Sequence, residues 1–129
     1  AQFVQAVKLS HKEQIPLFEA ENRVLGVSHA QAGAWLGRKW KLPEEIIEVI
    51  GQHHRALHTG EQPGSGLVQI CSLANLLVNH GRLGHSGNGE LDFSRMIEET
   101  FDLGGVSLVQ ITSDVKKRAT SSYLLMSFI

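Results

Sequence analysis

Residues 21–54 read ENRVLGVSHAQAGAWLGRKWKLPEEIIEVIGQHH, and this stretch decides the fold because it carries the boundary signals of successive helices. Gly26 is a natural stop for a helix that begins near Pro16. Ser28 opens the next helix through the capping box Ser-x-x-Gln, and we expect that helix to end near residue 40. A further helix is expected to start at Pro43. The pattern therefore indicates helices joined by short loops.

The helix that starts at Pro43 has the clearest apolar face. Proline loses no hydrogen bond in a first helical turn, and the two glutamates that follow favour the positive end of the helix. Isoleucines at positions 46, 47 and 50 form a stripe that continues to His53 or His54.

The rest of the chain extends the helical pattern in both directions. Segment 67–78, LVQICSLANLLV, is apolar nearly all round and is expected to be a central buried helix. Other expected helices lie near 3–9, from Asp92 or Ser94 to about 101, and from 107 almost to the end, with loops at 58–66 and 81–90. No run alternates between apolar and polar residues. We predict an all-α fold, a compact bundle of about six to seven helices, forming a single domain over 1–129.

Composition sets limits on the class of protein. The chain has 129 residues, of which 42% are hydrophobic and 19% charged, as in a folded soluble domain. Its net charge of −1 creates no field for nucleic acid or an anionic membrane, so we expect neither as a partner. A lone cysteine, no apolar stretch of ~20 residues and no visible secretory leader together favour a cytoplasmic location.

Histidines are the residues that could carry chemistry. The side chains of adjacent residues on a helix point ~100° apart, so His53 and His54 would serve two ions, or an ion and a substrate, rather than chelate one ion. On these residues alone the pattern favours a structural role instead, with one ring packed inward and the other solvated. His29 follows an N-cap, where the helix dipole keeps an imidazole neutral and suited either to ligation or to packing. Trp35 and Trp40 are expected to be core and edge anchors.

Taken together, these residues resemble the HDOD family, a catalytically degenerate branch of the HD-domain phosphohydrolase superfamily. The elements that carry the resemblance are Glu21, Gly26, His29, residues 33–36, residues 40–43, Ile50 and the pair His53-His54. The resemblance implies an HD-domain-like fold. It also implies that the chain is the C-terminal part of a family domain, and so a fragment of a longer protein.

The resemblance also carries expectations about a metal site. Active members of the parent superfamily hold metal through an early histidine, a His-Asp dipeptide and a late aspartate, and two-metal members add histidines at positions that His29, His53 and His54 match. This chain has no His-Asp dipeptide, and Asn75 stands where the late aspartate would be. A neutral amide is a poorer ligand for a hard cation than a carboxylate. An ion here would meet three imidazoles and no carboxylate.

The resemblance therefore implies a non-enzymatic, regulatory output module of bacterial signal transduction that acts by binding a protein or ligand. We expect no catalytic residues, no cofactor and no bound metal. Signalling protein domains are the expected partners, and a homodimer, or a purely structural dimerisation bundle, stays open. The alternative is a metal-dependent HD-type phosphodiesterase whose missing ligands lie upstream. It would hold Mn, Fe or Mg with His29, His53 and His54.

Overall fold

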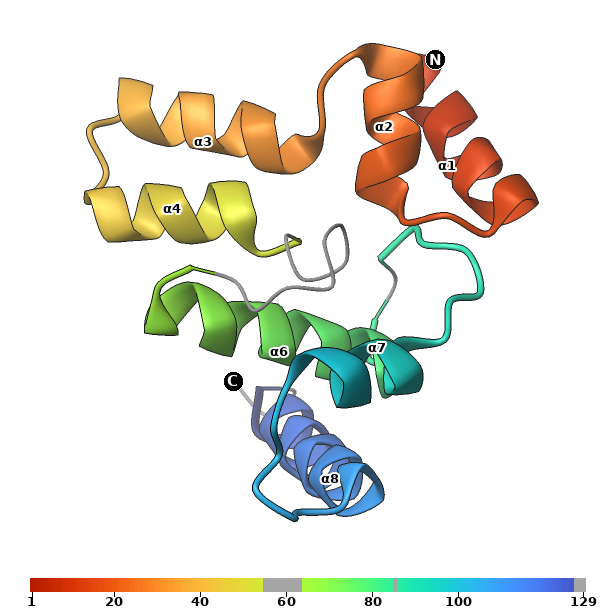
Figure 1. The fold of residues 1–129 in the computed structure, drawn as a ribbon, viewed down its shortest axis with the longest axis vertical. Helices are drawn as coiled ribbons and strands as arrows, with labels where there is room; N and C mark the ends of the chain where they lie inside the picture. The colour runs from red at the N-terminus through yellow and green to blue at the C-terminus, as the bar shows by residue number, and fades with distance from the viewer. Residues whose placement is uncertain (55–63, 85, 127–129) are drawn as a thin grey trace.

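A computed structural model describes residues 1–54, 64–84 and 86–126, with side chains up to residue 122. These residues form seven α-helices and no strand, which confirms the predicted all-α class (Figure 1). The helices are α1 Gln2–Glu13, α2 Leu17–Leu25, α3 His29–Lys39, α4 Glu44–Gln52, α6 Gly66–His80, α7 Phe93–Thr100 and α8 Leu108–Met126. None of these helices is both long enough and apolar enough to cross a membrane.

The predicted helix boundaries in the first half of the chain are confirmed. Gly26 follows α2 with a φ of 75°, a left-handed conformation that glycine adopts without steric cost. Ser28 caps α3 through both hydrogen bonds of the capping box. Pro43 is the residue before α4, whose first turn holds two glutamates. Asp92, one of the two expected caps, accepts a hydrogen bond from the backbone N–H of Arg95 at the start of α7.

Two helical hairpins form the N-terminal part of the molecule. Helices α1 and α2 lie against each other, and α3 and α4 run side by side (Figure 1). The second hairpin is closely packed because glycines on α3 face isoleucines on α4. A Cβ built on Gly33 would lie 2.7 Å from Ile50 Cγ2, and one built on Gly37 would lie 3.2 Å from Ile47 Cγ1.

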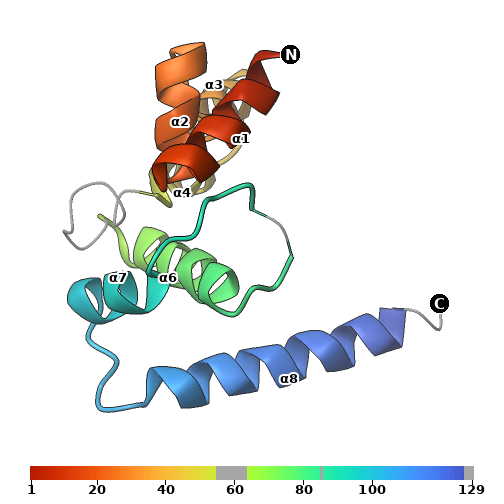
Figure 2. The same cartoon turned by 90° about the vertical axis from the view of Figure 1, so that its right-hand side faces the viewer.

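The C-terminal part has its own apolar core, built from α6, α7 and the start of α8. Its buried members are Leu76, Leu77, Phe93, Ile97 and Leu108. Helix α8 leaves this core after its first turns, and Figure 2 shows its long axis extending past the other helices. Further along this helix, Ile111 and Val115 are partly buried and Ala119 is exposed.

Two expectations about burial are wrong. Helix α6 is not buried all round, because Leu67, Ile70 and Val78 are exposed. Trp35 and Trp40 do not anchor the core, since they are 62% and 66% exposed on α3 and at its end. Most of the expected loop 58–66 lies outside the described residues.

Candidate functional site

The structure brings His29, His53 and His54 together. His29 is the first residue of α3, and the pair follows α4, whose last residue is Gln52. One ring nitrogen of each histidine lies within 4.8 Å of the others. The expected divergence of the pair applies to residues inside a helix. Since α4 ends before the pair, the rings of His53 and His54 lie 4.0 Å apart, centroid to centroid.

Burial keeps two of the three rings neutral. His54 stacks on Phe18, with ring centroids 5.0 Å apart and the planes 12° from parallel. Burial, followed by the nearby charges of His53 and His29, lowers the pKa of His54 to about 3. The pKa of His53 is also lowered, mainly by burial. Its Nδ1–H donates to the carbonyl oxygen of Ile50 at 2.9 Å, which leaves Nε2 without a proton in the neutral ring.

Glu21 is a residue of this site that sequence reasoning missed. Glu21 is only 2% exposed, and its Oε2 accepts hydrogen bonds from the backbone N–H of His29 at 2.8 Å and from Nδ1–H of the same residue at 2.6 Å. Among the described residues the candidate ligand group still consists of the three imidazoles, but a carboxylate lies directly behind one of them. A carboxylate stands behind His29, where it orients the ring and fixes its tautomer, as carboxylates behind metal-binding histidines do. Glu21 was part of the resemblance, but only its contact with α3 reveals the role.

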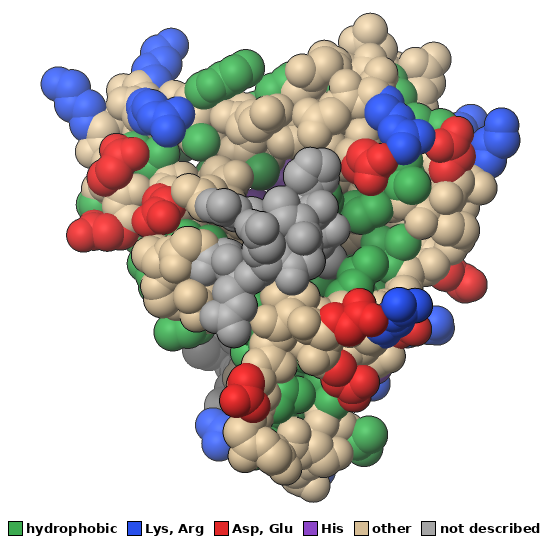
Figure 3. Space-filling view, in the orientation of Figure 1, with side chains coloured by type: hydrophobic (Ala, Val, Ile, Leu, Met, Phe, Trp, Pro, Cys, Tyr) green, Lys and Arg blue, Asp and Glu red, His purple; other side chains and the backbone are tan. Residues whose placement is uncertain are grey.

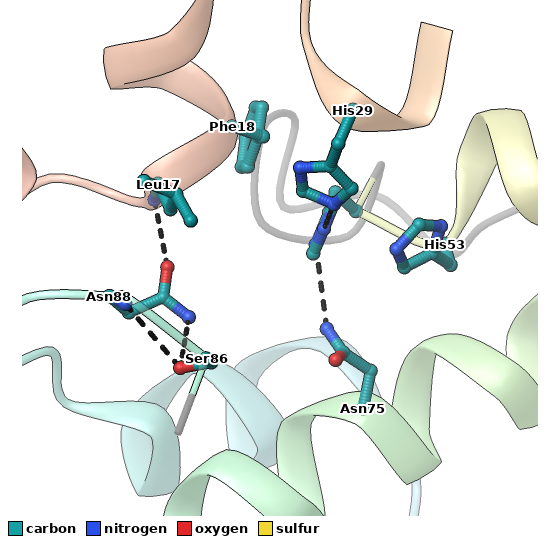
Figure 4. A pocket seen from close by; sticks show the side chains of 8 residues that line it. Leu17, Phe18, His29, His53, Asn75, Ser86 and Asn88 are labelled. Atoms are coloured by element: carbon teal, nitrogen blue, oxygen red, sulfur yellow. Dashed lines mark hydrogen bonds between the residues drawn. The ribbon is translucent and has the colours of Figure 1, made fainter. Parts of the chain in front are cut away.

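Asn75 lies beside the histidines. Its Nδ2 is 3.4 Å from Nδ1 of His54, and the opposite nitrogen of His54, Nε2, is 2.8 Å from Nε2 of His29. Asn79 and Asn88 continue the polar row away from the cluster. Asn88 accepts a hydrogen bond from the backbone N–H of Leu17 (Figure 4). The sequence pattern predicts that Asn75 lies on α6, but it does not predict the hydrogen bonds that link the side chains of Asn75, Asn79 and Asn88.

A small cavity of about 110 Å³ opens at the cluster. Its lining comes from five separate parts of the chain: Leu17, Phe18, His29, His53, His54, Asn75, Ser86 and Asn88. Figure 3 shows lysine, arginine, aspartate and glutamate side chains mainly towards the edge of the face that it presents. Apart from the carboxylate of Glu21, the described groups at the cavity are uncharged when the rings are neutral.

Tetrahedral Zn²⁺ and the oxygen-preferring ions Mg²⁺ and Mn²⁺ fit these side chains poorly. Two nitrogens bound at ~2.05 Å to a tetrahedral Zn²⁺ would stand about 3.3 Å apart. The 2.8 Å between Nε2 of His29 and Nε2 of His54 is a hydrogen-bond distance instead. Mg²⁺ and Mn²⁺ prefer oxygen ligands, and among the described residues no carboxylate joins the three nitrogens in the candidate ligand group.

Known proteins with related sequences and folds give this geometry a family context. Residues 1–56 match the sequence model of the HDOD domain. A solved structure of an HDOD domain protein of unknown function from Geobacter sulfurreducens aligns with a TM-score of 0.63 and 25% identity, over 93% of this chain and 43% of that one. The resemblance to the HDOD family is confirmed. The HDOD match includes all three histidines and Glu21, and the structural alignment extends the likeness to most of the chain.

A curated relative is similarly distant. An uncharacterized protein of Treponema pallidum (strain Nichols) is 25% identical over 125 residues, which are 97% of this chain and 22% of the relative. The HDOD-like chain thus spans about a fifth of that relative and less than half of the solved HDOD protein.

Proposed function

We propose that this HDOD-like chain is a non-enzymatic regulatory module of signal transduction, which acts by binding a protein or a small ligand. One observation carries the proposal. The imidazoles of His29 and His54 are joined in a hydrogen-bonded chain between Glu21 and Asn75, and His54 is held neutral by burial. This hydrogen-bonded row places neutral imidazole and amide groups at a small cavity, and its one carboxylate, Glu21, lies behind His29 and is not among the candidate ligands.

The chemistry of phosphoester hydrolysis explains why an enzyme is the weaker reading. A metal-activated hydroxide needs an ion held at fixed geometry with an open coordination position. Asn75 supplies no negative charge, and the aspartates of the chain are engaged elsewhere. Asp92 caps α7, Asp102 accepts a hydrogen bond from the backbone N–H of Gly104, and Asp114 accepts one from Gln110. All three lie at exposed positions.

A binding role also agrees with the surface of the α3–α4 hairpin. Trp35, Leu36 and Trp40 are exposed there, and exposed aromatic side chains are typical of protein interfaces. We therefore propose signalling protein domains or a second copy of the chain as partners, rather than nucleic acid or membrane. A cytoplasmic location in a bacterium follows from the same proposal.

The second candidate is a metal-dependent HD-type phosphohydrolase. The observation in its favour is the convergence of the three histidines, with a carboxylate behind one of them. In that case further ligands would come from a part of the protein outside this chain, and Mn²⁺, Fe²⁺ or Mg²⁺ would be the cofactor.

A turnover assay separates the two candidates. The longest form of the protein that carries this chain is incubated with phosphomonoesters, nucleotides and cyclic dinucleotides, with Mn²⁺, Fe²⁺ or Mg²⁺ added. We expect no hydrolysis above background, because no ligand set holds the ion. Hydrolysis that disappears in His29→Ala and in His54→Ala would establish the phosphohydrolase instead.

A further inference from the structure

We propose that Asn75 is a positioning residue that fixes the proton of His54 on Nε2 and thereby keeps this nitrogen from binding a metal ion. The proposal rests on the proposed function, in which the cluster holds no catalytic ion, and it names Asn75 as the residue that prevents the ion from binding. It follows from the direction of each hydrogen bond along the row of amides.

The first fixed point is the backbone of Leu17. Its N–H can only donate, and it donates to Oδ1 of Asn88 at 2.8 Å. The amide nitrogen of Asn88 must therefore point the other way, where it donates to Ser86 Oγ at 2.9 Å and to Asn79 Oδ1 at 3.1 Å. The orientation of Asn88 is set by a group that cannot change its role.

The second fixed point is the backbone carbonyl of Asn75. A carbonyl can only accept, and it accepts from Nδ2 of Asn79 at 2.7 Å. The amide of Asn79 is thus oriented on both sides, by this carbonyl and by Asn88. Its Nδ2 also lies 3.3 Å from Oδ1 of Asn75, which turns Nδ2 of Asn75 towards Nδ1 of His54, at 3.4 Å.

The amide nitrogen of Asn75 donates, so Nδ1 of His54 accepts. A neutral imidazole carries one N–H, which therefore lies on Nε2 of His54 and points at Nε2 of His29, 2.8 Å away. The hydrogen bond at the other end of this row, between His29 and Glu21, is consistent with that proton position. Oε2 of Glu21 accepts from Nδ1–H of His29, so the remaining nitrogen of His29 is free to accept. All the bonds run in one direction from Leu17 to Glu21.

A metal ion would need the lone pair of Nε2 of His54. To expose it, the proton must move to Nδ1, where it would face the N–H of Asn75. The direction of this hydrogen bond, and not only the missing negative charge at position 75, would then weaken metal binding at Nε2 of His54. The two explanations make different predictions for alanine at this position.

A Co²⁺ titration of untagged protein, followed by absorbance and calorimetry, distinguishes them. Asn75→Ala removes the donor without adding charge, and we expect it to bind Co²⁺ at least tenfold more tightly than the wild type. Asn75→Asp should bind more tightly still, because its carboxylate accepts the proton of Nδ1. Asn22→Ala, an exposed position on α2, is the control and should match the wild type. If only Asn75→Asp gains affinity, charge alone is responsible and the proposal is overturned.

The tautomer can be read directly by long-range ¹H–¹⁵N correlation spectra of the metal-free wild type. We expect a protonated Nε2 and an unprotonated Nδ1 at His54, and a mixture or the reverse in Asn75→Ala. A protonated Nδ1 at His54 in the wild type would overturn the proposal. That result would not affect the expectation that the protein hydrolyses no phosphoester. Conversely, hydrolysis in the turnover assay would overturn the proposed function but would leave the tautomer of His54 as proposed.

Discussion

At the scale of single residues, the half-buried and neutral ring of His54 sets the chemistry of the site. It lies between the ring of Phe18 and two other imidazoles, so an imidazolium there would lose its hydration and have other histidines as neighbours. The neutral ring can donate and accept at once, which lets it join His29 to Asn75. Acid should disturb this arrangement because the unfolded chain takes up the proton more readily.

The pKa of His54 gives a pH dependence with a definite sign. Since it falls from 6.5 to about 3 on folding, the unfolded state binds more protons below pH 6.5. This contribution to stability is complete above pH ~6.5 and is lost as the pH falls towards 3. At pH ~5 the loss is about 2 kcal/mol in the free energy of unfolding. Urea unfolding at about pH 7.5 and pH 5 measures it.

Two substitutions serve as controls for this measurement. His54→Gln removes the titrating group and should reduce the difference between the two pH values by about the predicted amount. His11→Gln, at an exposed histidine on α1, should keep the wild-type difference. An unchanged pH dependence in His54→Gln would show that this ring is not the source.

At the scale of elements, the α3–α4 hairpin positions the histidines. His29 begins one helix and the pair follows the other, so the distance between the two helices determines whether the rings meet. That distance depends on Gly33, where a Cβ would lie 2.7 Å from Ile50 Cγ2. The tip of the isoleucine side chain would have to move to admit even a methyl group.

Gly33→Ala should destabilise the fold by ~1–3 kcal/mol, because an added methyl overpacks the contact between α3 and α4. Gly66→Ala, at the start of α6, is the matched control. No atom of the described residues lies within 4 Å of a Cβ built there, so this variant should be neutral or slightly stabilising. Thermal or urea unfolding measures both variants. Equal stability of the two would contradict the close packing of the hairpin.

Helix boundaries were the part of the fold that could be predicted best. Gly26, the capping box at Ser28 and Pro43 act through neighbouring backbone groups, so local sequence contains the signal. Burial could not be predicted in the same way. The apolar segment 67–78 and the exposed Trp35 show that an apolar side chain is buried only where another element arrives to cover it.

The three histidines of the candidate site could be predicted from the sequence, but the hydrogen bonds that join them to Glu21 and Asn75 could not. The resemblance selected His29, His53 and His54, and the structure places them together. The role of Glu21 depends on how α2 meets α3. The role of Asn75 depends on a row of amides that spans α6 and the segment before α7, and no local pattern encodes it.

At the scale of the whole molecule, α8 is attached by its first turns. Leu108 is buried in the core with α6 and α7, while the neighbouring Val109 is 77% exposed. Most described side chains after Val115 are exposed, and Figure 2 shows this part of the helix extending past the other helices. The position of α8 therefore depends on a few apolar contacts near its start.

Leu108→Ala should lower the free energy of unfolding by ~2–5 kcal/mol, since it leaves a cavity in the C-terminal core. Val109→Ala removes an exposed side chain of the same helix and should change stability by less than ~0.5 kcal/mol. Urea unfolding followed by circular dichroism compares the two. A loss in Val109→Ala as large as that in Leu108→Ala would mean that the exposed face of α8 is covered.

The central claim is that the histidine cluster works as a set of hydrogen-bonded neutral groups and not as a metal centre. Elemental analysis of the purified, untagged protein tests this most directly. We expect Fe, Mn and Zn to be well below one equivalent per chain, in the wild type and in His53→Ala alike. One or more tightly bound equivalents of Fe, Mn or Zn per chain in the wild type, lost in His53→Ala, would contradict the account.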